Sequence, residues 1–489
     1  MSEEIKKLEP KEVWKHFYSM TRVPRPSKHE EAIQKFIMDF GEESGLETVR
    51  DKVGNIIIRK PATPGMENCK GIILQAHLDM VPQKNTSMQH DFTKDPIIPV
   101  IEGEWVKAKG TTLGSDNGIG VAAIMAVLES KEIPHGPVEA LLTCDEETGM
   151  TGANGLQPGL LKGEILINLD SEDEGELYIG CAGGVDVSAE FPVREVEVPE
   201  FYIPYRISLT GLKGGHSGLD INYGRGNANR IMNELLMLAA EKAGARLSNI
   251  EGGDLRNAIP REAFATVVIP ENKKEEFKTV VAEFEENAKL MFKEADPGLM
   301  ITAASTKMPQ HVIDMDSQTR IYQAIAALPN GMISMLKDMP TVVETSTNLA
   351  IVRLKDGKVF TACLLRSSVD EKKMELAGKM KSILEEAGGN VTISGEYPGW
   401  KPNVDSPILD VMKTVYQKRF GKVPEVKVIH AGLECGILGS KYPHWDMISF
   451  GPTIRGPHSP NEKVHIGTVG LFWEFLLETL KHCPEGRRA

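Results

Sequence analysis

Side chains of the kinds that bind metal ions gather in five short segments, and their placement constrains the fold more than any other feature. The segments are residues 77–81, 114–118, 145–149, 168–172 and 456–462. Four of them follow an apolar, strand-like run, as the run ending at Ala76 precedes His77. The polar side chains are therefore expected at strand ends, where open α/β sheets bind ligands. Imidazole and carboxylate groups suit zinc and its borderline neighbours.

Two stretches of the chain have an α/β pattern. Residues 10–186 alternate helical and strand-like patterns, and the apolar residues of 30–43 recur at helical spacing. The alternation resumes towards the C-terminus with a helix expected over 408–420. This pattern predicts an α/β layer with a mainly parallel sheet. Because His458 lies in the second stretch, the chain has to return to the sheet that it began before residue 170. We therefore predict one discontinuous domain, formed by residues 1–186 and 403–489.

The intervening residues 187–402 are predicted to form an inserted α+β domain. Two stretches within them follow the same order of strand, helix and strand, which suggests a duplicated unit. The first stretch comprises 263–269, 273–292 and 300–304, and the second comprises 359–365, 370–387 and 390–394.

Composition and charge exclude several classes of protein. The 489 residues carry a net charge of −13, which argues against nucleic acid or an anionic membrane surface as a partner. No apolar run approaches the ~20 residues of a membrane span, and the N-terminus lacks the apolar core of a signal peptide. The six cysteines are dispersed, without a Cys-x-x-Cys pair. We expect a reduced, cytoplasmic enzyme.

The order of the motifs resembles a known family. His-x-Asp, Ser-Asp-Asn-Gly, Asp-Glu-Glu-x-Gly, Asp-Ser-Glu and Gly-Pro-His follow one another as in the zinc aminoacylase and carboxypeptidase superfamily of co-catalytic metallopeptidases. The strings 75–82, 113–120 and 144–152 are most similar to its aminoacyl-histidine (Xaa-His) dipeptidase branch. The resemblance covers about residues 14–477. It implies a zinc-peptidase-like catalytic domain, with the insertion acting as a lid and dimerisation domain.

His77 and Asp79 form the first motif. Residues i and i+2 of a strand point to the same face, so the two side chains lie side by side. Asp79 can then accept a hydrogen bond from the imidazole nitrogen that does not bind metal. A lone His-x-Asp is more often an ordinary histidine at a strand end, but the set of five motifs favours the metal site.

The resemblance implies two divalent metal ions, zinc first, with cobalt or manganese as alternatives. Asp116 is implied to bridge both ions, and the peptide bond between Asp116 and Asn117 is implied to be cis. Taken alone, Ser115 and Asp116 would simply cap the next helix. The implied ligand sets are His77, Asp116 and Asp170 for one ion, and Asp116, Glu147 and His458 for the other.

The adjacent carboxylates of Glu146 and Glu147 diverge after a strand, so one can bind metal while the other stays free. The resemblance assigns Glu147 to the metal and Glu146 to general acid–base work. Without the other motifs, an acidic turn in solvent would explain them equally well.

Four further residues are candidates for binding substrate. The resemblance implies that His216, often supplied by the partner subunit of a homodimer, stabilises the oxyanion, and that Asn257 contacts substrate from the lid. Relatives often have an arginine on the lid strand 263–269, which this chain lacks. Arg366 could instead bind the substrate carboxylate, and Glu434 the α-ammonium group. Glycine turns of purely structural use would explain the segments around His216 and Glu434 equally well.

These features favour a metal-dependent dipeptidase that hydrolyses Xaa-His and related dipeptides by attack of a metal-bridging water. The alternative is an N-acyl amino acid deacylase on the same two-metal scaffold. A non-catalytic peptide-binding relative is disfavoured because all five motifs and Glu146 are present.

Overall fold

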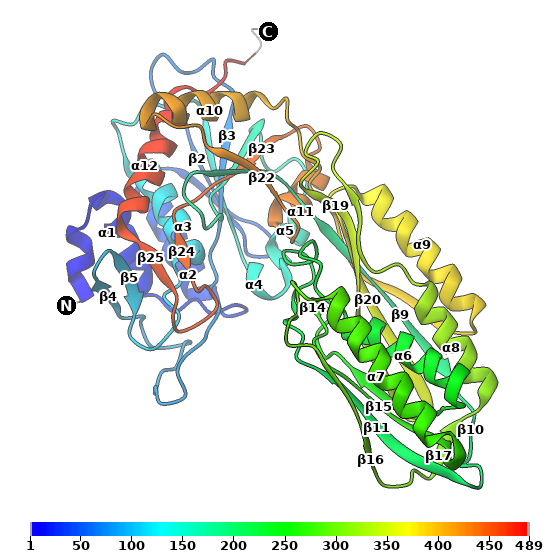
Figure 1. The fold of residues 1–489 in the computed structure, drawn as a ribbon. Helices are drawn as coiled ribbons and strands as arrows, with labels where there is room; N and C mark the ends of the chain where they lie inside the picture. Colours follow the sequence, from blue (N-terminus) through cyan, green and yellow to red (C-terminus); the bar gives the residue numbers. More distant parts are fainter. Residues whose placement is uncertain (1, 487–489) are drawn as a thin grey trace. The chain divides into compact units, whose positions relative to one another are not determined.

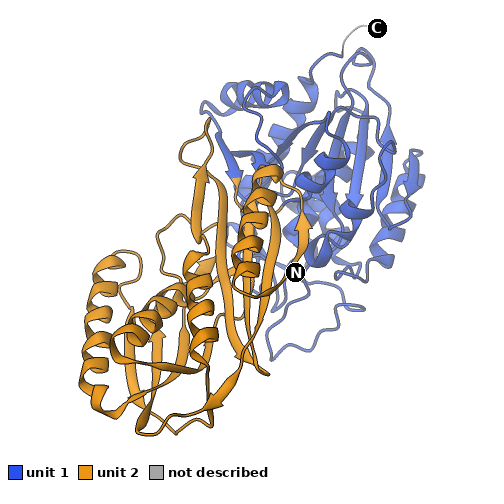
Figure 2. Cartoon of the chain, turned by 90° about the vertical axis from the view of Figure 1, so that its right-hand side faces the viewer, with its two compact units in different colours: residues 1–180, 400–428, 433–489 blue, residues 181–399, 429–432 orange. Residues whose placement is uncertain are grey.

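The computed structural model describes residues 2–486 and divides the chain into two compact units (Figure 2). Unit 1 comprises Met1–Gly180, Trp400–Val428 and Leu433–Ala489, and unit 2 comprises Cys181–Gly399 and Ile429–Gly432. The sequence predicted a discontinuous domain of residues 1–186 and 403–489 and an inserted domain of residues 187–402. The short segment Ile429–Gly432 belongs to unit 2 although the residues on both sides of it belong to unit 1. This segment was not predicted from the sequence.

Unit 1 is built on an eight-stranded sheet. Its strands, in spatial order, are β1 (Glu47–Arg50), β2 (Ile56–Lys60), β6 (Val138–Thr143), β3 (Ile72–His77), β7 (Ile165–Asn168), β23 (Asp446–Ser449), β8 (Glu176–Cys181) and β22 (Glu425–Ile429). A smaller sheet has the order β24 (Ile454–Arg455), β25 (Lys463–His465), β5 (Trp105–Ala108) and β4 (Pro99–Glu102).

The prediction of an α/β fold is confirmed, but the sheet is mixed rather than mainly parallel. The four neighbours β6, β3, β7 and β23 run parallel, whereas β1–β2, β2–β6 and β23–β8 are antiparallel. The reason lies partly in loop length, because parallel neighbours need a long crossover and a short turn reverses the chain. Between β1 and β2 the Asp51 side chain accepts hydrogen bonds from the backbone of Val53, Gly54 and Asn55, which closes such a turn.

The helices of unit 1 are α1 (Lys11–Thr21), α2 (Glu31–Glu43), α3 (Ser115–Glu129), α4 (Glu146–Gly149), α5 (Thr151–Gly155), α10 (Pro407–Phe420), α11 (Glu434–Lys441) and α12 (Ile466–Lys481), with a 3₁₀ helix, η1 (Ser2–Lys7). Helix α3 packs on β3 and contacts α1. It is buried on every side from Asn117 to Leu128, as expected of a helix that is apolar all round. It therefore holds its N-terminal residues rigidly against the sheet.

Unit 2 contains a nine-stranded antiparallel sheet (Figure 1). The strand order is β16 (Met300–Ser305), β11 (Tyr202–Thr210), β15 (Ala263–Pro270), β13 (Arg246–Gly252), β19 (Val343–Lys355), β20 (Lys358–Ser367), β9 (Gly183–Pro192) and β21 (Asn390–Tyr397), with β18 (Gly331–Met335) beside β19. Two short ribbons pair β10 (Glu195–Glu197) with β17 (His311–Ile313), and β12 (Gly215–His216) with β14 (Ala258–Ile259).

The four helices of unit 2 are α6 (Ala228–Ala243), α7 (Lys274–Met291), α8 (Met315–Ala327) and α9 (Asp370–Glu386), and η2 (Glu271–Lys273) precedes α7. They share one hydrophobic core with the sheet. Chain order and strand order together divide the unit into two similar halves. One half is β11-α6-β13-β15-α7-β16, and the other is β9-α8-β19-β20-α9-β21. In each half the fourth strand lies next to the first, and the halves join where β13 pairs with β19.

The two predicted strand–helix–strand stretches correspond to the last three elements of each half.

Side chains define the N-terminal ends of several helices in both units. Asn227, Asp314 and Ser406 accept hydrogen bonds from backbone N–H groups in the first turns of α6, α8 and α10. No helix in residues 2–486 is long and apolar enough to cross a membrane.

Candidate metal centre

The predicted ligands of unit 1 lie around one edge of its sheet. His77 is the last residue of β3, Glu147 lies in α4 shortly after β6, and Asp170 follows β7. Because these strands are parallel, their carboxyl ends meet at the same edge. Asp116 precedes the regular part of α3, and His458 lies in the loop between β24 and β25. The fold thus gathers residues from both ends of unit 1.

The gathered side chains form two groups that share Asp116. Candidate ligand atoms lie within 4.8 Å of one another in His77, Asp116 and Asp170, and again in Asp116, Glu147 and His458. Oδ1 of Asp116 is 3.0 Å from Nε2 of His77, and its Oδ2 is 3.3 Å from Nε2 of His458. The two oxygens of one carboxylate therefore face two different histidines. The Asp116–Asn117 peptide bond is cis, as the resemblance implied.

The donor set fits divalent cations. Oε1 of Glu147 and Oδ1 of Asp170 are buried, and neither has a hydrogen-bond partner among the described residues. Buried carboxylate oxygens without donors are costly unless a cation binds them. Imidazole and carboxylate oxygen together suit zinc and neighbouring metals. This structure thus has the residues that two divalent ions would need.

The crowding of these groups also shifts their proton affinities. Burial, together with the charges of Asp116 and Glu147, raises the pKa of Asp170 to about 7, although His77 opposes the shift. Hydrogen bonds that the His458 ring donates to Asp116 and Glu147 raise the pKa of His458 to about 11. In the protein alone, protons thus balance the negative charges that metal ions would otherwise balance.

Asp79 orients both the histidine and the backbone beside it. Its Oδ1 lies 3.3 Å from Nδ1 of His77, so the Nε2 of that ring points to Asp116 and Asp170. It also accepts hydrogen bonds from the backbone N–H groups of Glu146 (3.0 Å) and Glu147 (3.2 Å). Burial opposes ionisation, but the bonds to His77 and these donors hold the pKa of Asp79 at about 2. The contact with the Glu146–Glu147 backbone was not anticipated from the sequence.

Glu146 lies beside His77 and Glu147, and the three form a further group of candidate ligand atoms within 4.8 Å. Burial raises the pKa of Glu146 well above its usual value, and the charges of Asp170 and Glu434 add to the effect. A carboxylate with a raised pKa accepts a proton readily at neutral pH. This is the property that a general base needs.

Sequence reasoning missed Glu462, which holds the Asp116 loop. Its carboxylate is 2% exposed and accepts hydrogen bonds from a continuous stretch of backbone. The donors are the N–H groups of Leu113 (2.8 Å), Gly114 (3.1 Å), Ser115 (2.7 Å) and Asp116 (3.3 Å) and the hydroxyl of Ser115 (2.6 Å). Glu462 belongs to the same motif as His458, so it ties the loops of the two ligands together. Its position in the motif of His458 was the sequence feature that could have identified it.

Arg25 was also missed, and its sequence context carries no signal. The buried guanidinium donates through Nη1 to the carbonyl oxygens of Leu78 and Asp79, each at 2.9 Å, and through Nη2 to Gly114. It therefore joins the loop after β3 to the loop before α3. A single buried cation holds the backbone on both sides of the first ligand group.

Glu434 lies within a buried polar network beneath the ligands. It is 0% exposed, and its Oε2 accepts hydrogen bonds from Nε2 of Gln75 and Oγ1 of Thr143, both at 2.7 Å. Gln75 is paired in register with Asn168, whose Oδ1 accepts from the backbone N–H of Asp170 at 3.2 Å. Burial raises the pKa of Glu434 to about 7. Its Oε1 has no hydrogen-bond partner among the described residues.

The remaining candidates belong to unit 2. Asn257 is exposed, and its carbonyl accepts a hydrogen bond from the N–H of Ser217 at 2.8 Å. His216 and Arg366 lie together, with 3.4 Å between Nε2 and Nη2.

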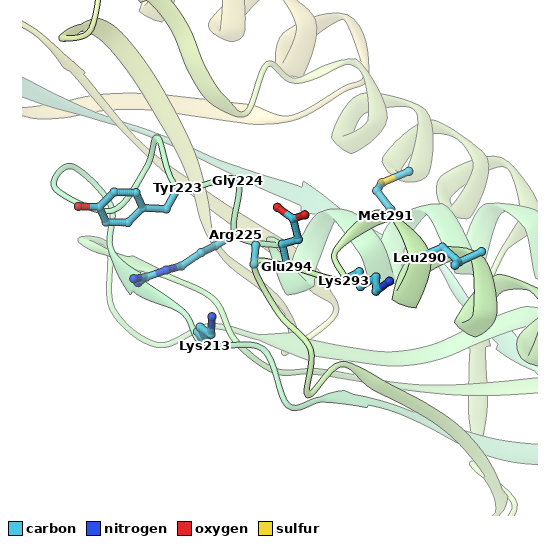
Figure 3. Close-up of a pocket in the computed structure, with 9 residues that line it drawn as sticks. Lys213, Tyr223, Gly224, Arg225, Leu290, Met291, Lys293 and Glu294 are labelled. Carbon is cyan, nitrogen blue, oxygen red and sulfur yellow. The ribbon is translucent and has the colours of Figure 1, made fainter.

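An open pocket of unit 2 is lined in part by Tyr223 and Arg225, which belong to the loop that carries His216 (Figure 3). Arg225 donates to the carbonyl of Gly214 and pairs with Asp220 at 3.2 Å. Asp220 in turn accepts from the N–H of His216 at 2.8 Å. These contacts hold the loop in place, so the pocket lies beside the residues that position His216.

Comparison with known proteins defines the class. Residues 73–482 match the model of peptidase family M20/M25/M40, and the chain belongs to this family. It is 46% identical over 481 residues to the cytosol non-specific dipeptidase of Escherichia coli (strain K12), covering 98% of this chain and 99% of that protein. The crystal structure of aminoacylhistidine dipeptidase from Vibrio alginolyticus superposes with a TM-score of 0.95 at 48% identity, over 100% of both chains. Aminopeptidase PepT from Bacillus cereus ATCC 10987 shares the fold, with a TM-score of 0.56 at 17% identity, over 97% of this chain and 99% of that one.

Metal removal is expected to destabilise the protein. Without cations, the binding free energy of the metals is lost, and only protons balance the charges of Asp116, Glu147 and Asp170. A chelator should lower the midpoint of thermal unfolding by about 5 °C or more, and added zinc should restore it. The Asp116→Ala variant is the control, because the chelator should shift it far less. Equal shifts in both proteins would contradict the shared site.

Glu462→Gln should weaken metal binding while the protein stays folded. The amide keeps the size of the carboxylate, but it has one acceptor oxygen instead of two for the donors of residues 113–116. We expect ~10–100-fold weaker zinc binding in a competition titration, as for other groups that hold ligands in place. Glu474→Gln, an exposed change on α12, is the matched control. If Glu462→Gln bound zinc with wild-type affinity, the hydrogen bonds of Glu462 to residues 113–116 would not determine the ligand geometry.

Proposed function

We propose that this protein is a metal-dependent dipeptidase that hydrolyses Xaa-His and related dipeptides to free amino acids. The observation that carries the proposal is the pair of ligand groups sharing Asp116, with Glu146 beside them. The whole-length similarity to two proteins named as dipeptidases supports this substrate class. An N-acyl amino acid deacylase on the same scaffold is the alternative. The name of the Escherichia coli relative supports a cytoplasmic location.

Two divalent ions, zinc first, would be held by the two ligand groups. His77, Asp116 and Asp170 would bind one ion, and Asp116, Glu147 and His458 the other. Bound there, the ions supply Lewis-acid polarisation of the scissile carbonyl and a lowered pKa of water. Asp79 keeps His77 in the orientation that this binding needs.

Glu146 moves the proton. Its carboxylate takes a proton from the attacking water and passes it to the nitrogen of the leaving amine. The raised pKa of Glu146 suits both transfers, because the group binds the proton and then releases it. Asp79 fixes the backbone N–H of Glu146 and so positions the base.

Unit 2 supplies His216, Arg366 and Asn257 for recognition of the substrate, and unit 1 supplies Glu434. The Nδ1 of His216 accepts backbone hydrogen bonds, so its Nε2–H is free to donate to the oxyanion. Arg366 binds the carboxylate of the dipeptide, and Asn257 contacts the substrate from the lid. Oε1 of Glu434, which has no donor in residues 2–486, accepts from the α-ammonium group. In this proposal unit 2 is a lid that moves against unit 1 and also forms a homodimer.

Glu146→Gln tests the proton transfer. The variant keeps the shape of the side chain and all the ligands but cannot accept a proton, so kcat should fall by ~10²–10⁴-fold or more. Metal content, measured by atomic absorption, should stay at the wild-type level. A wild-type kcat would refute the role of Glu146.

Substrate analogues separate the dipeptidase from the deacylase. A buried charge left without its partner is costly, so dipeptide amides and N-acetyl dipeptides should lose most of kcat/KM. Arg366→Ala should make the rates for dipeptide acids and amides similar, whereas the exposed Arg206→Ala should leave their ratio unchanged. Equal rates on N-acetyl amino acids and free dipeptides would favour the deacylase.

A further inference from the structure

His430 is a buried histidine outside the predicted site. It belongs to Ile429–Gly432, the short segment that joins unit 2, and is 7% exposed. The N–H of Ala182 donates to the carbonyls of Ile429 (3.0 Å) and Ala431 (3.1 Å), which anchors this segment. On its other side, a Cβ added to Gly218 would lie 1.9 Å from the carbonyl oxygen of His430. His430 is therefore packed tightly against the segment that carries His216.

Ser346 connects His430 with Arg366, because it contacts the first and is paired with the second across two strands. Ser346 on β19 pairs with Arg366 on β20, and directly paired residues project to the same face. Oγ of Ser346 lies 2.7 Å from Nε2 of His430. Arg366 also pairs with Gly184 on β9, which in turn pairs with Tyr397 on β21. The missing side chain at Gly184 leaves room for Tyr397, whose hydroxyl is 3.0 Å from Nη1 of Arg366.

The polar groups gathered there include donors that lack an acceptor. Arg366 is 4% exposed and makes no ion pair in residues 2–486, because Asp186, whose charge acts on it, pairs with Arg256 instead. Nδ1 of His216 accepts from the N–H groups of Gly218 and Leu219, so a neutral ring carries its proton on Nε2, facing Nη2 of Arg366. Two donors thus face each other at 3.4 Å. A ligand with acceptor atoms and negative charge would satisfy both.

His430 adds a third polar atom without a partner. Its Nδ1 is buried and has no hydrogen-bond partner within the described part of the chain. Burial, with the charges of Arg366 and His216, lowers the pKa of His430 to about 3, so the ring is neutral at physiological pH. When the hydroxyl of Ser346 donates to Nε2, the single ring proton lies on Nδ1. The histidine is then a fixed neutral donor next to a buried cation.

We propose that His430, through Nδ1–H, binds the free carboxylate of the substrate together with Arg366. This inference rests on the proposed dipeptidase function and deepens it. In a dipeptide, only the amide nitrogen and one Cα separate the scissile carbonyl carbon from the carboxylate carbon. Adjacent donors can therefore serve both acceptors, His216 the oxyanion and the pair of Arg366 and His430 the carboxylate. A longer peptide would place an amide carbonyl, without charge, at this pair.

Two substitutions at position 430 separate the roles of the ring nitrogens. His430→Gln places an amide near Nε2, so it can keep the contact to Ser346 while losing the donor at Nδ1. His430→Asn places its amide nitrogen near Nδ1 and loses the contact to Ser346. His311→Gln, on an exposed histidine of the same unit, makes the same chemical change away from the cluster. Circular dichroism and metal content check that each variant is folded and loaded.

Steady-state kinetics on Ala-His and Ala-His amide give the first measurement. For His430→Gln, the KM for the acid should rise by ~10–100-fold, with kcat and the KM for the amide nearly unchanged. His430→Asn should keep more of the preference for the acid, and His311→Gln should match wild type. A KM that is unchanged, or that rises equally for acid and amide, would overturn the proposal.

Calorimetric titration of the zinc-loaded protein with histidine and with histidinamide gives the second measurement, which needs no turnover. Wild type should bind histidine more tightly than its amide, and His430→Gln should lose this difference. If wild type cleaves no dipeptide, the proposed function fails, but the titration still decides whether His430 reads a carboxylate. Equal binding of histidine and histidinamide to wild type would refute the inference.

Discussion

The carboxylate of Asp116 is the interaction on which the rest of the site depends. Its two oxygens face His77 and His458, residues from opposite ends of the sequence, and so make two ligand groups into one centre. A carboxylate can bridge two cations only if it is held still, because a bidentate bridge tolerates little rotation. The surrounding structure supplies this rigidity. Helix α3 is buried on all sides, and Glu462 accepts hydrogen bonds along the loop that leads into it.

Buried charge is distributed around the centre in pairs and networks. Arg25 and Glu462 are both almost fully buried, and each satisfies several backbone groups rather than one side chain. Asp79 does the same for the backbone of Glu146 and Glu147. A buried ion without such partners would cost several kcal/mol. The same reasoning singles out Arg366, a buried cation that makes no ion pair with a carboxylate among the described residues. That imbalance points to a ligand.

Much of the fold and of the site could be predicted from the sequence, and the exceptions have physical causes. The α/β class and the converging motifs follow from periodicity and from the chemistry of ligands at strand ends. The direction of the outer strands does not, because it depends on loop length and pairing as well as on the strand itself. Glu434 illustrates a further limit. The sequence places this glutamate in a glycine-flanked loop but does not indicate its partners, and the structure buries it fully against Gln75 and Thr143.

The sequence by itself determined which side chains could bind metal and transfer a proton, because His77, Asp116, Glu146, Glu147, Asp170 and His458 stand in motifs whose order is specific. Only the tertiary structure decided which residues hold them. Glu462 and Arg25 act on backbone atoms, and backbone hydrogen bonds leave little trace in residue type. Only the tertiary structure also revealed His430, because strand register sets Ser346 beside Arg366 and chain packing assigns Ile429–Gly432 to unit 2. Register and packing are properties of the whole chain, and no local pattern encodes them.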